Sequence, residues 1–390
     1  METISFIIPS HNNLMYLKTA YNSIRKHHGY IHEIVMLDDA SEDGTWDWLE
    51  EIKKTDVNLQ IYRNDGPKLG HTILYDIGVD MCKSDIFSIF HADMICSPLY
   101  VENLLKHLKE KTVVSATRIE PPLHPEGKEK IVMDFGLWPD EIKENEFLSF
   151  CEKKREEFKD VTTKGIFAPW LMYKKDFQDI GGHDPLFAPF PYEDSDIFNR
   201  FILAGYNIVQ SRDSFVYHLT CRGHRWTSGE LGKNDDMYPI YERNARRNYL
   251  RKWGSWVKND EYQCPIIPPK YDVGFVIKNC NYQILEELEP WCSTIYTDWA
   301  WDRYVNTEQS NTSYDLNKRV YSINAEKHND IIVRFDGKDI TNERFRLLQQ
   351  LPEILENDEE LEVGSFGLSI FEIEINKIKT YTEELIKCES

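Results

Sequence analysis

The sequence lacks several features that would assign the chain to a common class of protein. It has no run of about 18 consecutive apolar residues, so we expect no segment to span a bilayer. Met1-Glu2-Thr3 offers no basic region ahead of the apolar residues 4–8, which argues against a secretory signal peptide. The eight cysteines include no C-x-x-C pair. We therefore expect neither a zinc site nor a disulfide framework, and a cytoplasmic location.

Positive charge is scarce as well. The 46 lysines and arginines are outnumbered by 66 acidic residues, and the net charge is -20. Such a chain repels a phosphate backbone unless its basic residues are concentrated on one face, so general nucleic-acid binding is disfavoured. With 390 residues, of which 41% are hydrophobic, the chain is long enough to fold as two domains with substantial cores.

Strand-like and helix-like segments alternate along the first hundred residues. Helical spacing of apolar residues separates four apolar strand patterns, at 4–8, 33–37, 59–62 and 86–90. This alternation with short loops indicates βαβ units and predicts an α/β fold with a Rossmann-like, mostly parallel central sheet. Ligands of such sheets bind outside the carboxyl ends of the strands.

A proline-containing segment at 256–270 divides the chain and reads as a linker. Residues 1–255 then form the first domain, which a basic amphipathic helix at 241–253 closes. Residues 271–390 form a smaller α/β accessory domain of unknown role, with helical stretches near 341–357 and 375–387. It shows no chemical motif, and we consider acceptor recognition, oligomer formation or attachment to a partner as its role.

Polar residues follow each of the first four strands of the predicted sheet. They are Ser10-His11-Asn12, Asp38-Asp39, Asn64-Asp65, and the pair His91 and Asp93. Since the carboxyl ends of parallel strands share one edge of a sheet, these polar residues are expected to converge.

Each of these motifs has a structural and a chemical interpretation. The carboxylates at 38 and 39 suit hydrogen bonds from a uracil imide or a ribose hydroxyl, or they cap the following helix. His91-x-Asp93 suits Mg²⁺ or Mn²⁺, or it is a polar loop after a strand. Glu193-Asp194 supplies a general base or caps an apolar helix, and His218 is a ligand or a structural side chain.

A basic loop stands out in this acidic chain. Residues 220–233 collect the basic and aromatic side chains Arg222, His224, Arg225, Trp226 and Lys233 around Gly223 and Gly229. Such a loop indicates an anionic ligand and is typical of a lid over a diphosphate.

In their order along the chain, these motifs resemble the GT-A glycosyltransferases of family 2. The ordered motifs are Pro9-Ser10-His11-Asn12, residues 37–45 with Asp38-Asp39, Asn64-Asp65-Gly66, His91-Ala92-Asp93, Gly181-Gly182-His183-Asp184 and Glu193-Asp194. The resemblance covers roughly residues 1–255 and says nothing of 270–390.

The resemblance implies a role for each motif. A nucleotide sugar would be bound by Pro9, Ser10, His11, Asp39, Asn64, His91, Arg222 and Trp226. Asp93 would bind the metal at the position of the family's Asp-x-Asp motif, together with His218 and His91, and Asp194 beside Glu193 would be the catalytic base. The acceptor and sugar side would be shaped by Gly182, His183, Asp184 and Trp170. His11 replaces the usual tyrosine, and His91 replaces the first acid of Asp-x-Asp.

The function implied is that of an inverting glycosyltransferase that depends on Mn²⁺ or Mg²⁺. Its donor would be a nucleotide sugar, with UDP-sugar favoured, and its acceptor a carbohydrate or glycoconjugate. Two alternatives stay open: a non-catalytic module that binds nucleotide sugars or glycans on the same scaffold, and a glycosyltransferase acting on modified DNA bases. A pyrophosphate-forming nucleotidyltransferase ranks last, because no glycine-rich basic loop follows the first strand.

Overall fold

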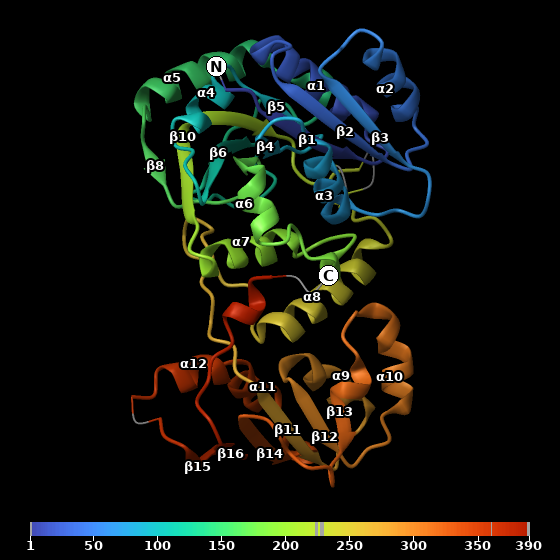
Figure 1. Cartoon of the computed structure of the whole chain (residues 1–390), viewed down its shortest axis with the longest axis vertical. Coiled ribbons are helices and arrows are strands. Elements are labelled where there is room, and N and C mark those ends of the chain that lie inside the picture. The colour runs from blue at the N-terminus through green and yellow to red at the C-terminus, as the bar shows by residue number, and fades with distance from the viewer. Residues whose placement is uncertain (1, 223–224, 227–229, 360, 388–390) are drawn as a thin grey trace. The chain divides into compact units, whose positions relative to one another are not determined.

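The structure, a computed structural model, describes residues 2–222, 225–226, 230–359 and 361–387. It divides into two compact units (Figure 1). Unit 1 holds the described residues up to Tyr241 together with Asn259–Ile266. Unit 2 holds Glu242–Lys258 and Ile267–Lys387. Among the described residues, no helix is both long enough and apolar enough to cross a membrane.

The boundaries of the two units differ from the division into 1–255, 256–270 and 271–390 that the sequence suggested. Residues of helix α8 (Tyr238–Trp253) from Glu242 onward belong to unit 2, where Arg251 Nη2 lies 2.8 Å from Glu289 Oε2. Part of the expected linker belongs to unit 1 instead, where Glu261 Oε2 pairs with Lys128 Nζ at 2.6 Å. Ion pairs between residues far apart in the sequence place these segments, and a local composition pattern does not record such pairs.

Unit 1 is built on a mixed sheet whose strands run in the order β3-β2-β1-β4-β9-β6-β10-β5. The pairs β1–β2, β2–β3, β1–β4 and β6–β10 are parallel, while β9 runs antiparallel to both β4 and β6. Two short strands lie outside this path, with β7 on β6 and β8 on β10. The strands are β1 (Ser5–Ser10), β2 (Glu33–Asp39), β3 (Leu59–Asn64), β4 (Ile86–Ile89), β5 (Met94–Cys96), β6 (Thr112–Glu120), β7 (Lys130–Val132), β8 (Thr162–Thr163), β9 (Trp170–Tyr173) and β10 (Asn207–His218).

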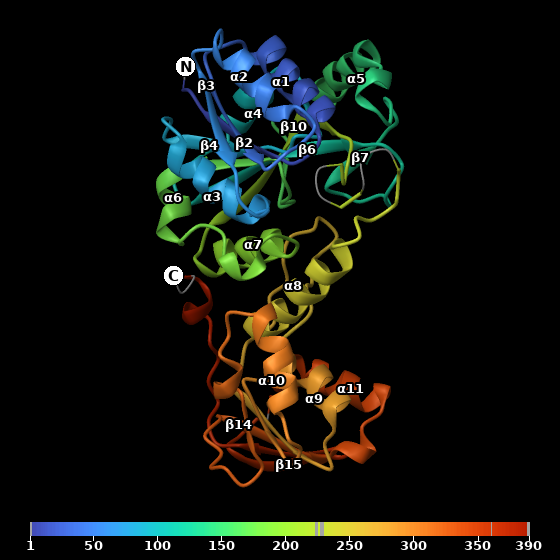
Figure 2. The ribbon, with the colours of Figure 1, turned by 90° about the vertical axis from the view of Figure 1, so that its right-hand side faces the viewer.

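Helices cover the sheet of unit 1 on both faces. Helices α1 and α2 lie on one side of strands β1–β3 and α3 lies on the other (Figures 1 and 2). The apolar stripe of α1, which includes Leu17, Ala20 and Ile24, is buried, and its C-terminal turn ends at Gly29 with a φ of 63°. The helices are α1 (Leu14–His28), α2 (Thr45–Lys53), α3 (His71–Met81), α4 (Tyr100–Leu105), α5 (Glu144–Glu157), α6 (Lys174–Asp179) and α7 (Glu193–Leu203).

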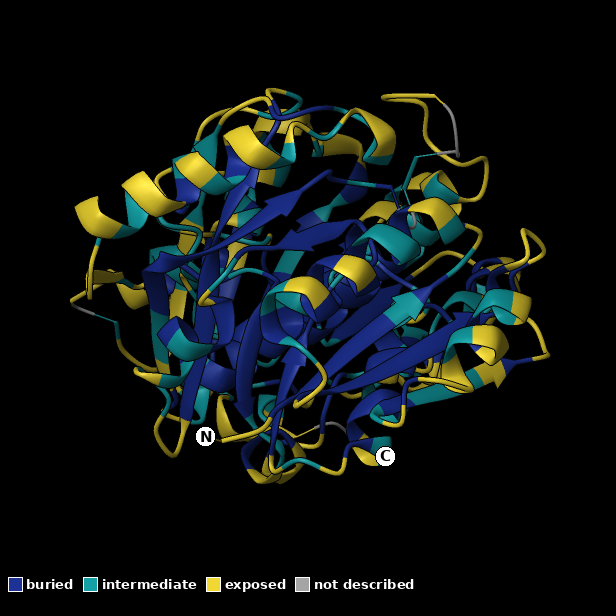
Figure 3. Ribbon diagram, turned by 90° about the horizontal axis from the view of Figure 1, so that it is seen from above, coloured by how far each residue is buried: buried dark blue, intermediate teal, exposed yellow. Residues whose placement is uncertain are grey.

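The strands form the buried interior, as Figure 3 shows by colour. All residues of β2 are buried, in keeping with the continuous apolar runs of strands that are covered on both faces. The covering helices alternate buried and exposed positions (Figure 3).

Strand β10 is much longer than its apolar pattern suggests. Only Phe215-Val216-Tyr217 reads as strand in the sequence, whereas β10 spans twelve residues. A register shift lies between Gln210 and Phe215. The polar residues there are buried but hydrogen-bonded: Ser211 Oγ donates to Asp213 Oδ1 at 2.6 Å, and Ser214 Oγ donates to the Tyr100 carbonyl at 2.9 Å. Satisfied polar groups allow a strand to stay buried without apolar alternation.

Unit 2 contains a second sheet in the order β13-β12-β11-β14-β16-β15. The first four of these strands are parallel, and β16 and β15 continue the sheet antiparallel. The elements are β11 (Val273–Lys278), α9 (Tyr282–Leu288), β12 (Thr294–Thr297), α10 (Asp302–Glu308), β13 (Val320–Ser322), β14 (Ile331–Asp336), α11 (Asn342–Gln349), α12 (Leu351–Glu356), β15 (Gly364–Leu368) and β16 (Phe371–Ile375). One hydrophobic core joins these elements to Leu250 of α8.

The helix expected at 375–387 is wrong. Ile375 ends strand β16, and the described residues after it contain only a short 3-10 turn at Glu383–Leu385. The spacing of the apolar residues 373, 375 and 378 fits a helix, but it fits equally well a strand followed by a loop. Pairing with β14 decides for the strand.

Candidate functional site

One cavity of about 600 Å³ opens at the carboxyl ends of β1, β2, β4, β6 and β10. Its lining includes nine of the residues singled out in the sequence: Pro9, Ser10, His11, Asp39, His91, Asp93, Glu193, Asp194 and His218. The cavity size is typical of a site for a small molecule or cofactor. The convergence expected for the polar strand ends is present in the structure.

Asp39 organises the loop that follows β3. Its Oδ1 accepts hydrogen bonds from Asn64 Nδ2 at 2.7 Å and the Leu69 amide at 3.0 Å, and its Oδ2 accepts from the Gly70 amide at 2.8 Å. Gly70 has a φ of 79°, and a Cβ there would come within 2.3 Å of Pro189. Asn64 does not line the cavity itself but acts on it through Asp39.

His11 lies beside Asp39 at the same end of the cavity. Its Nδ1 is 2.6 Å from the Asp39 carbonyl oxygen, which therefore accepts a hydrogen bond from the ring Nδ1–H. The imidazole is thus held at the position where the resemblance places an aromatic ring. A flat ring held in this way offers a face on which a nucleobase can stack.

Lys68 is a lining residue that the sequence interpretation missed. Its Nζ lies 5.4 Å from the ring centroid of Phe190, and both residues line the cavity. Burial lowers the pKa of Lys68, while the charges of Asp39 and Asp235 act in the opposite direction. The sequence did contain a signal for an anion-binding group here, namely a lysine in a glycine-bearing loop that follows a strand.

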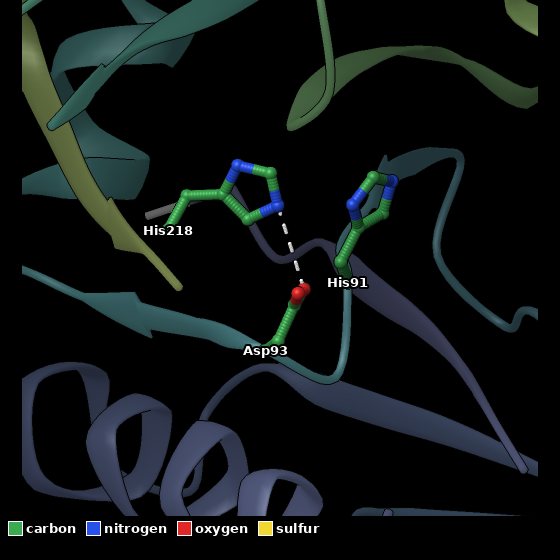
Figure 4. Close-up of side chains that lie close together, drawn as sticks. All are labelled: His91, Asp93 and His218. Carbon is green, nitrogen blue, oxygen red and sulfur yellow. Dashed lines mark ion pairs between the residues drawn. The ribbon is translucent and has the colours of Figure 1, made fainter. Parts of the chain in front are cut away.

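His91, Asp93 and His218 form a compact group, and their side chains point toward one another (Figure 4). One potential ligand atom from each lies within 4.8 Å of those of the other two. His218 Nε2 is 3.5 Å from Asp93 Oδ1. Strand pairing produces this proximity, because β5 runs antiparallel to β10 with Met94, the residue after Asp93, opposite His218.

The donor chemistry of this group suits a divalent cation. It offers one carboxylate and two imidazoles, a mixture that Mn²⁺ accepts, and three protein ligands leave positions for diphosphate oxygens and water. Burial would raise the pKa of Asp93, but His218, His91 and the Arg222 amide hold it well below its usual range. Asp93 therefore stays an anionic ligand at neutral pH.

Glu120 lies behind His218 and was missed in the sequence. Its Oε1 is 2.8 Å from His218 Nδ1 and 2.9 Å from Arg118 Nη1, and its Oε2 accepts from Lys130 Nζ at 2.9 Å. Burial lowers the pKa of His218, but the carboxylates of Asp93 and Glu120 outweigh that effect and raise it to about 9. The sequence contained a signal for its position: Arg118 and Glu120 alternate with the apolar Ile119, so they continue the strand that the sequence predicts at 113–117.

Glu193 and Asp194 are the first two residues of helix α7, and both line the cavity. Glu193 Oε1 is 2.5 Å from His71 Nε2. Burial raises the pKa of Asp194 to about 6, the charge of Glu193 acts in the same direction, and His71, His183 and Arg118 oppose the shift. A carboxylate whose pKa lies near neutral pH is suited to accept a proton.

Part of the chain is similar to known glycosyltransferases. Residues 5–180 match the family described as glycosyl transferase family 2. This match concerns residues 5–180, and it names the family that the order of the motifs resembles. A glycosyltransferase of Haemophilus influenzae, itself called uncharacterized, is 28% identical over 113 residues, which are 29% of this chain. The chain spans about a third of the length of that relative, 35%.

A solved structure is also similar. It is described as GalNAc-T7 with UDP, GalNAc and Mn²⁺, and the likeness has a TM-score of 0.47 at 18% identity. It covers 67% of this chain and 49% of that chain.

Four residues that were expected on the acceptor and sugar side do not line the cavity: Gly182, His183, Asp184 and Trp170. Trp170 is fully buried in the core. His183 Nδ1 is 2.7 Å from Asp76 Oδ1, and Asp184 Oδ1 caps a short 3-10 turn by accepting from the Leu186 amide at 2.9 Å. These residues shape the support of α7, so their effect on the site is indirect.

The basic loop at 220–233 is only partly described by the structure. His224, Gly223 and Gly229 lie outside the described residues. The Arg222 amide donates to Asp93 Oδ2 at 3.1 Å, and its guanidinium lies 5.0 Å from the Trp138 ring and 5.2 Å from the Trp226 ring. Arg222 and Trp226 do not line the cavity, but Trp226 lies 5.8 Å from His124, which does. Arg222 therefore adjoins Asp93, and Trp226 adjoins the cavity lining at His124.

Proposed function

We propose that the chain is an inverting, metal-dependent glycosyltransferase that transfers a sugar from a nucleotide sugar, with UDP-sugar favoured, to a carbohydrate or glycoconjugate acceptor. One observation carries the proposal: a single cavity is lined by three sets of residues. They are Asp39 and His11, which we call the nucleotide end, the group His91, Asp93 and His218, and the carboxylate of Asp194. A donor bound along that cavity would place its diphosphate between the nucleotide end and Asp194.

The nucleotide end offers complementary chemistry for a nucleoside. Asp39 Oδ2 accepts one hydrogen bond, from Gly70, so it keeps a further acceptor position for a uracil imide or a hydroxyl. His11 offers its ring face, and the Lys68 ammonium offers positive charge to a carbonyl or phosphate oxygen.

His91, Asp93 and His218 would hold a Mn²⁺ or Mg²⁺ ion, which neutralises charge on a diphosphate when it is bound. Lys68, which lines the same cavity, would add a positive charge near the diphosphate. This preorganised charge stabilises the leaving nucleoside diphosphate as its negative charge develops.

Asp194 is the proposed base. It takes the proton from an acceptor hydroxyl while that oxygen forms a bond to the anomeric carbon. At the same time the bond from the anomeric carbon to the diphosphate oxygen breaks, and the electron pair leaves with the nucleoside diphosphate. A single displacement inverts the configuration at the anomeric carbon.

A donor screen tests this function. Thermal melting of the full chain with Mn²⁺ would be measured against UDP-, GDP- and dTDP-sugars, because a ligand that binds only the folded state raises the melting temperature. We expect a shift for one nucleotide class that disappears without metal. Release of the nucleoside diphosphate from the same donor would then be followed over hours.

The screen also separates the enzyme from a binding module. Donor binding without any release of nucleoside diphosphate, with or without oligosaccharide acceptors, would favour the non-catalytic alternative. No shift with any nucleotide sugar would reject the proposed function.

A further inference from the structure

We propose that Glu120 is a positioning residue for the metal site: it fixes the orientation and tautomer of His218, so that Nε2 is the atom presented to the cation. This inference rests on the metal part of the proposed function. Glu120 contacts neither of the other two proposed ligands in any recorded interaction; its carboxylate acts through His218.

The sheet places Glu120 beside His218. Strands β6 and β10 run parallel with Ile119 opposite Tyr217, so Glu120 and His218 are the next residues on each strand. Residues directly opposite on neighbouring strands point to the same face of the sheet. Their contact, 2.8 Å between Oε1 and Nδ1, therefore follows from backbone pairing rather than from a flexible loop.

Two permanent cations hold the Glu120 carboxylate in place. Arg118 lies two residues earlier on the same strand and thus on the same face, and Lys130 belongs to β7, which pairs with β6 with Lys130 opposite Arg118. Each cation bonds a different oxygen of Glu120. Glu120 is only 2% exposed, so these bonds are shielded from competing water.

This arrangement has a direct consequence for a bound metal. A neutral imidazole that donates its Nδ1 proton to Glu120 has its lone pair on Nε2, which lies on the Asp93 side. A carboxylate behind a histidine ligand fixes the ring and raises its basicity, and loss of such a partner typically weakens metal affinity about 10- to 100-fold. Without Glu120, the ring can rotate or adopt the other tautomer.

The test is direct binding of Mn²⁺ to the full chain, followed by electron paramagnetic resonance of the free ion. We expect Glu120→Gln to weaken Mn²⁺ binding about 10- to 100-fold. The matched control is Glu129→Gln, which removes the same charge from the same wall of the cavity. Glu129 Oε1 lies 3.4 Å from Arg118 Nη2, and no contact with His218 is recorded for it. This control is expected to bind Mn²⁺ as the unmodified chain does.

A second variant covers the case in which Glu120→Gln does not fold. Glu120→Met with Lys130→Met removes the buried ion pair as a unit, a replacement that folded proteins often tolerate. It is also expected to bind Mn²⁺ weakly. In every variant that folds, the visible spectrum of bound Co²⁺ reports ligand geometry, which a change in stability alone would not alter. We expect it to change with Glu120 and to be preserved in Glu129→Gln.

The outcomes separate the two proposals. If the unmodified chain binds no Mn²⁺, the metal part of the proposed function fails, and the role of Glu120 fails with it. If the unmodified chain binds Mn²⁺ and loss of Glu120 changes neither affinity nor the Co²⁺ spectrum, only the role of Glu120 is overturned. Equal weakening in Glu120→Gln and Glu129→Gln would likewise overturn it, since charge alone would then explain the effect.

Discussion

His71 Nε2 lies 2.5 Å from Glu193 Oε1 in the wall of the cavity, and this contact distinguishes two adjacent acids. Burial lowers the pKa of His71, but the Glu193 carboxylate outweighs burial and raises it. The carboxylate of Glu193 is thus engaged by His71, whereas burial and Glu193 together raise the pKa of Asp194. Neighbouring acids whose environments differ in this way can take different roles.

Asp194→Asn should abolish sugar transfer and leave donor binding intact, because an amide cannot accept the acceptor proton. In the unmodified chain the base must be ionised, so the rate should rise with pH through about 6, the pKa of Asp194, and level off above it. Initial rates and donor affinity between pH 5 and pH 8 would be measured on both proteins. A near-normal rate in Asp194→Asn would exclude it as the base.

The same substitution should stabilise the fold at alkaline pH. The pKa of Asp194 is raised from 3.8 to about 6 in the folded state, so its contribution to stability is full below 3.8 and is lost as the pH rises through about 6. Asn removes the cost of the buried charge, about 1–3 kcal/mol above that pH. Urea unfolding at pH 8 and pH 4 would measure the free energy of unfolding of both proteins. The difference between them is expected to be smaller at pH 4 than at pH 8.

Asp93→Asn should weaken UDP binding only when Mn²⁺ is present, because the residue acts through the cation. Its side chain is 5% exposed and accepts from the Arg222 amide, which an amide oxygen can also do, so the fold should survive the change. Calorimetric titration with UDP, with and without Mn²⁺, measures the effect. Equal UDP affinity of the unmodified chain in both conditions would contradict the metal role.

Lys68→Met should weaken nucleotide binding with and without metal, since the ammonium is proposed to contact the nucleotide itself. The loss of one charge-assisted hydrogen bond corresponds to roughly 1.5–3 kcal/mol. Lys83→Met is the matched control, because Lys83 is 70% exposed and pairs with Glu33 away from the cavity lining. Titration with UDP would compare the two, and an equal loss in both would point to net charge rather than to contact.

In unit 2, Glu289 anchors a buried network, and Glu289→Gln should destabilise the fold strongly. Its carboxylate is fully buried and bonds Arg251, Arg319 and Tyr304. Breaking a buried pair leaves uncompensated charge, at a cost of about 3–5 kcal/mol. Glu374→Gln removes the pair with the 35% exposed Arg334 and should cost about 1 kcal/mol or less. Chemical denaturation of each variant checks the contrast.

Local pattern was enough to predict the sheet of unit 1 and the polar strand ends. The strands at 4–8, 33–37 and 86–90 can be predicted from their own apolar residues alone, without knowledge of distant contacts. The order of the motifs then indicated the family. The same reasoning placed Trp170 and His183 at the site, where the structure has them in the core and against Asp76.

The sequence by itself therefore determined the fold class and predicted which polar residues, among them His91, Asp93 and Asp194, could carry the chemistry. Only the tertiary structure decided which partners they have. Glu120 is 98 residues from His218, and His71 is 122 residues from Glu193. Strand register and helix packing bring these pairs together, and both are set by contacts between distant segments that no local pattern contains.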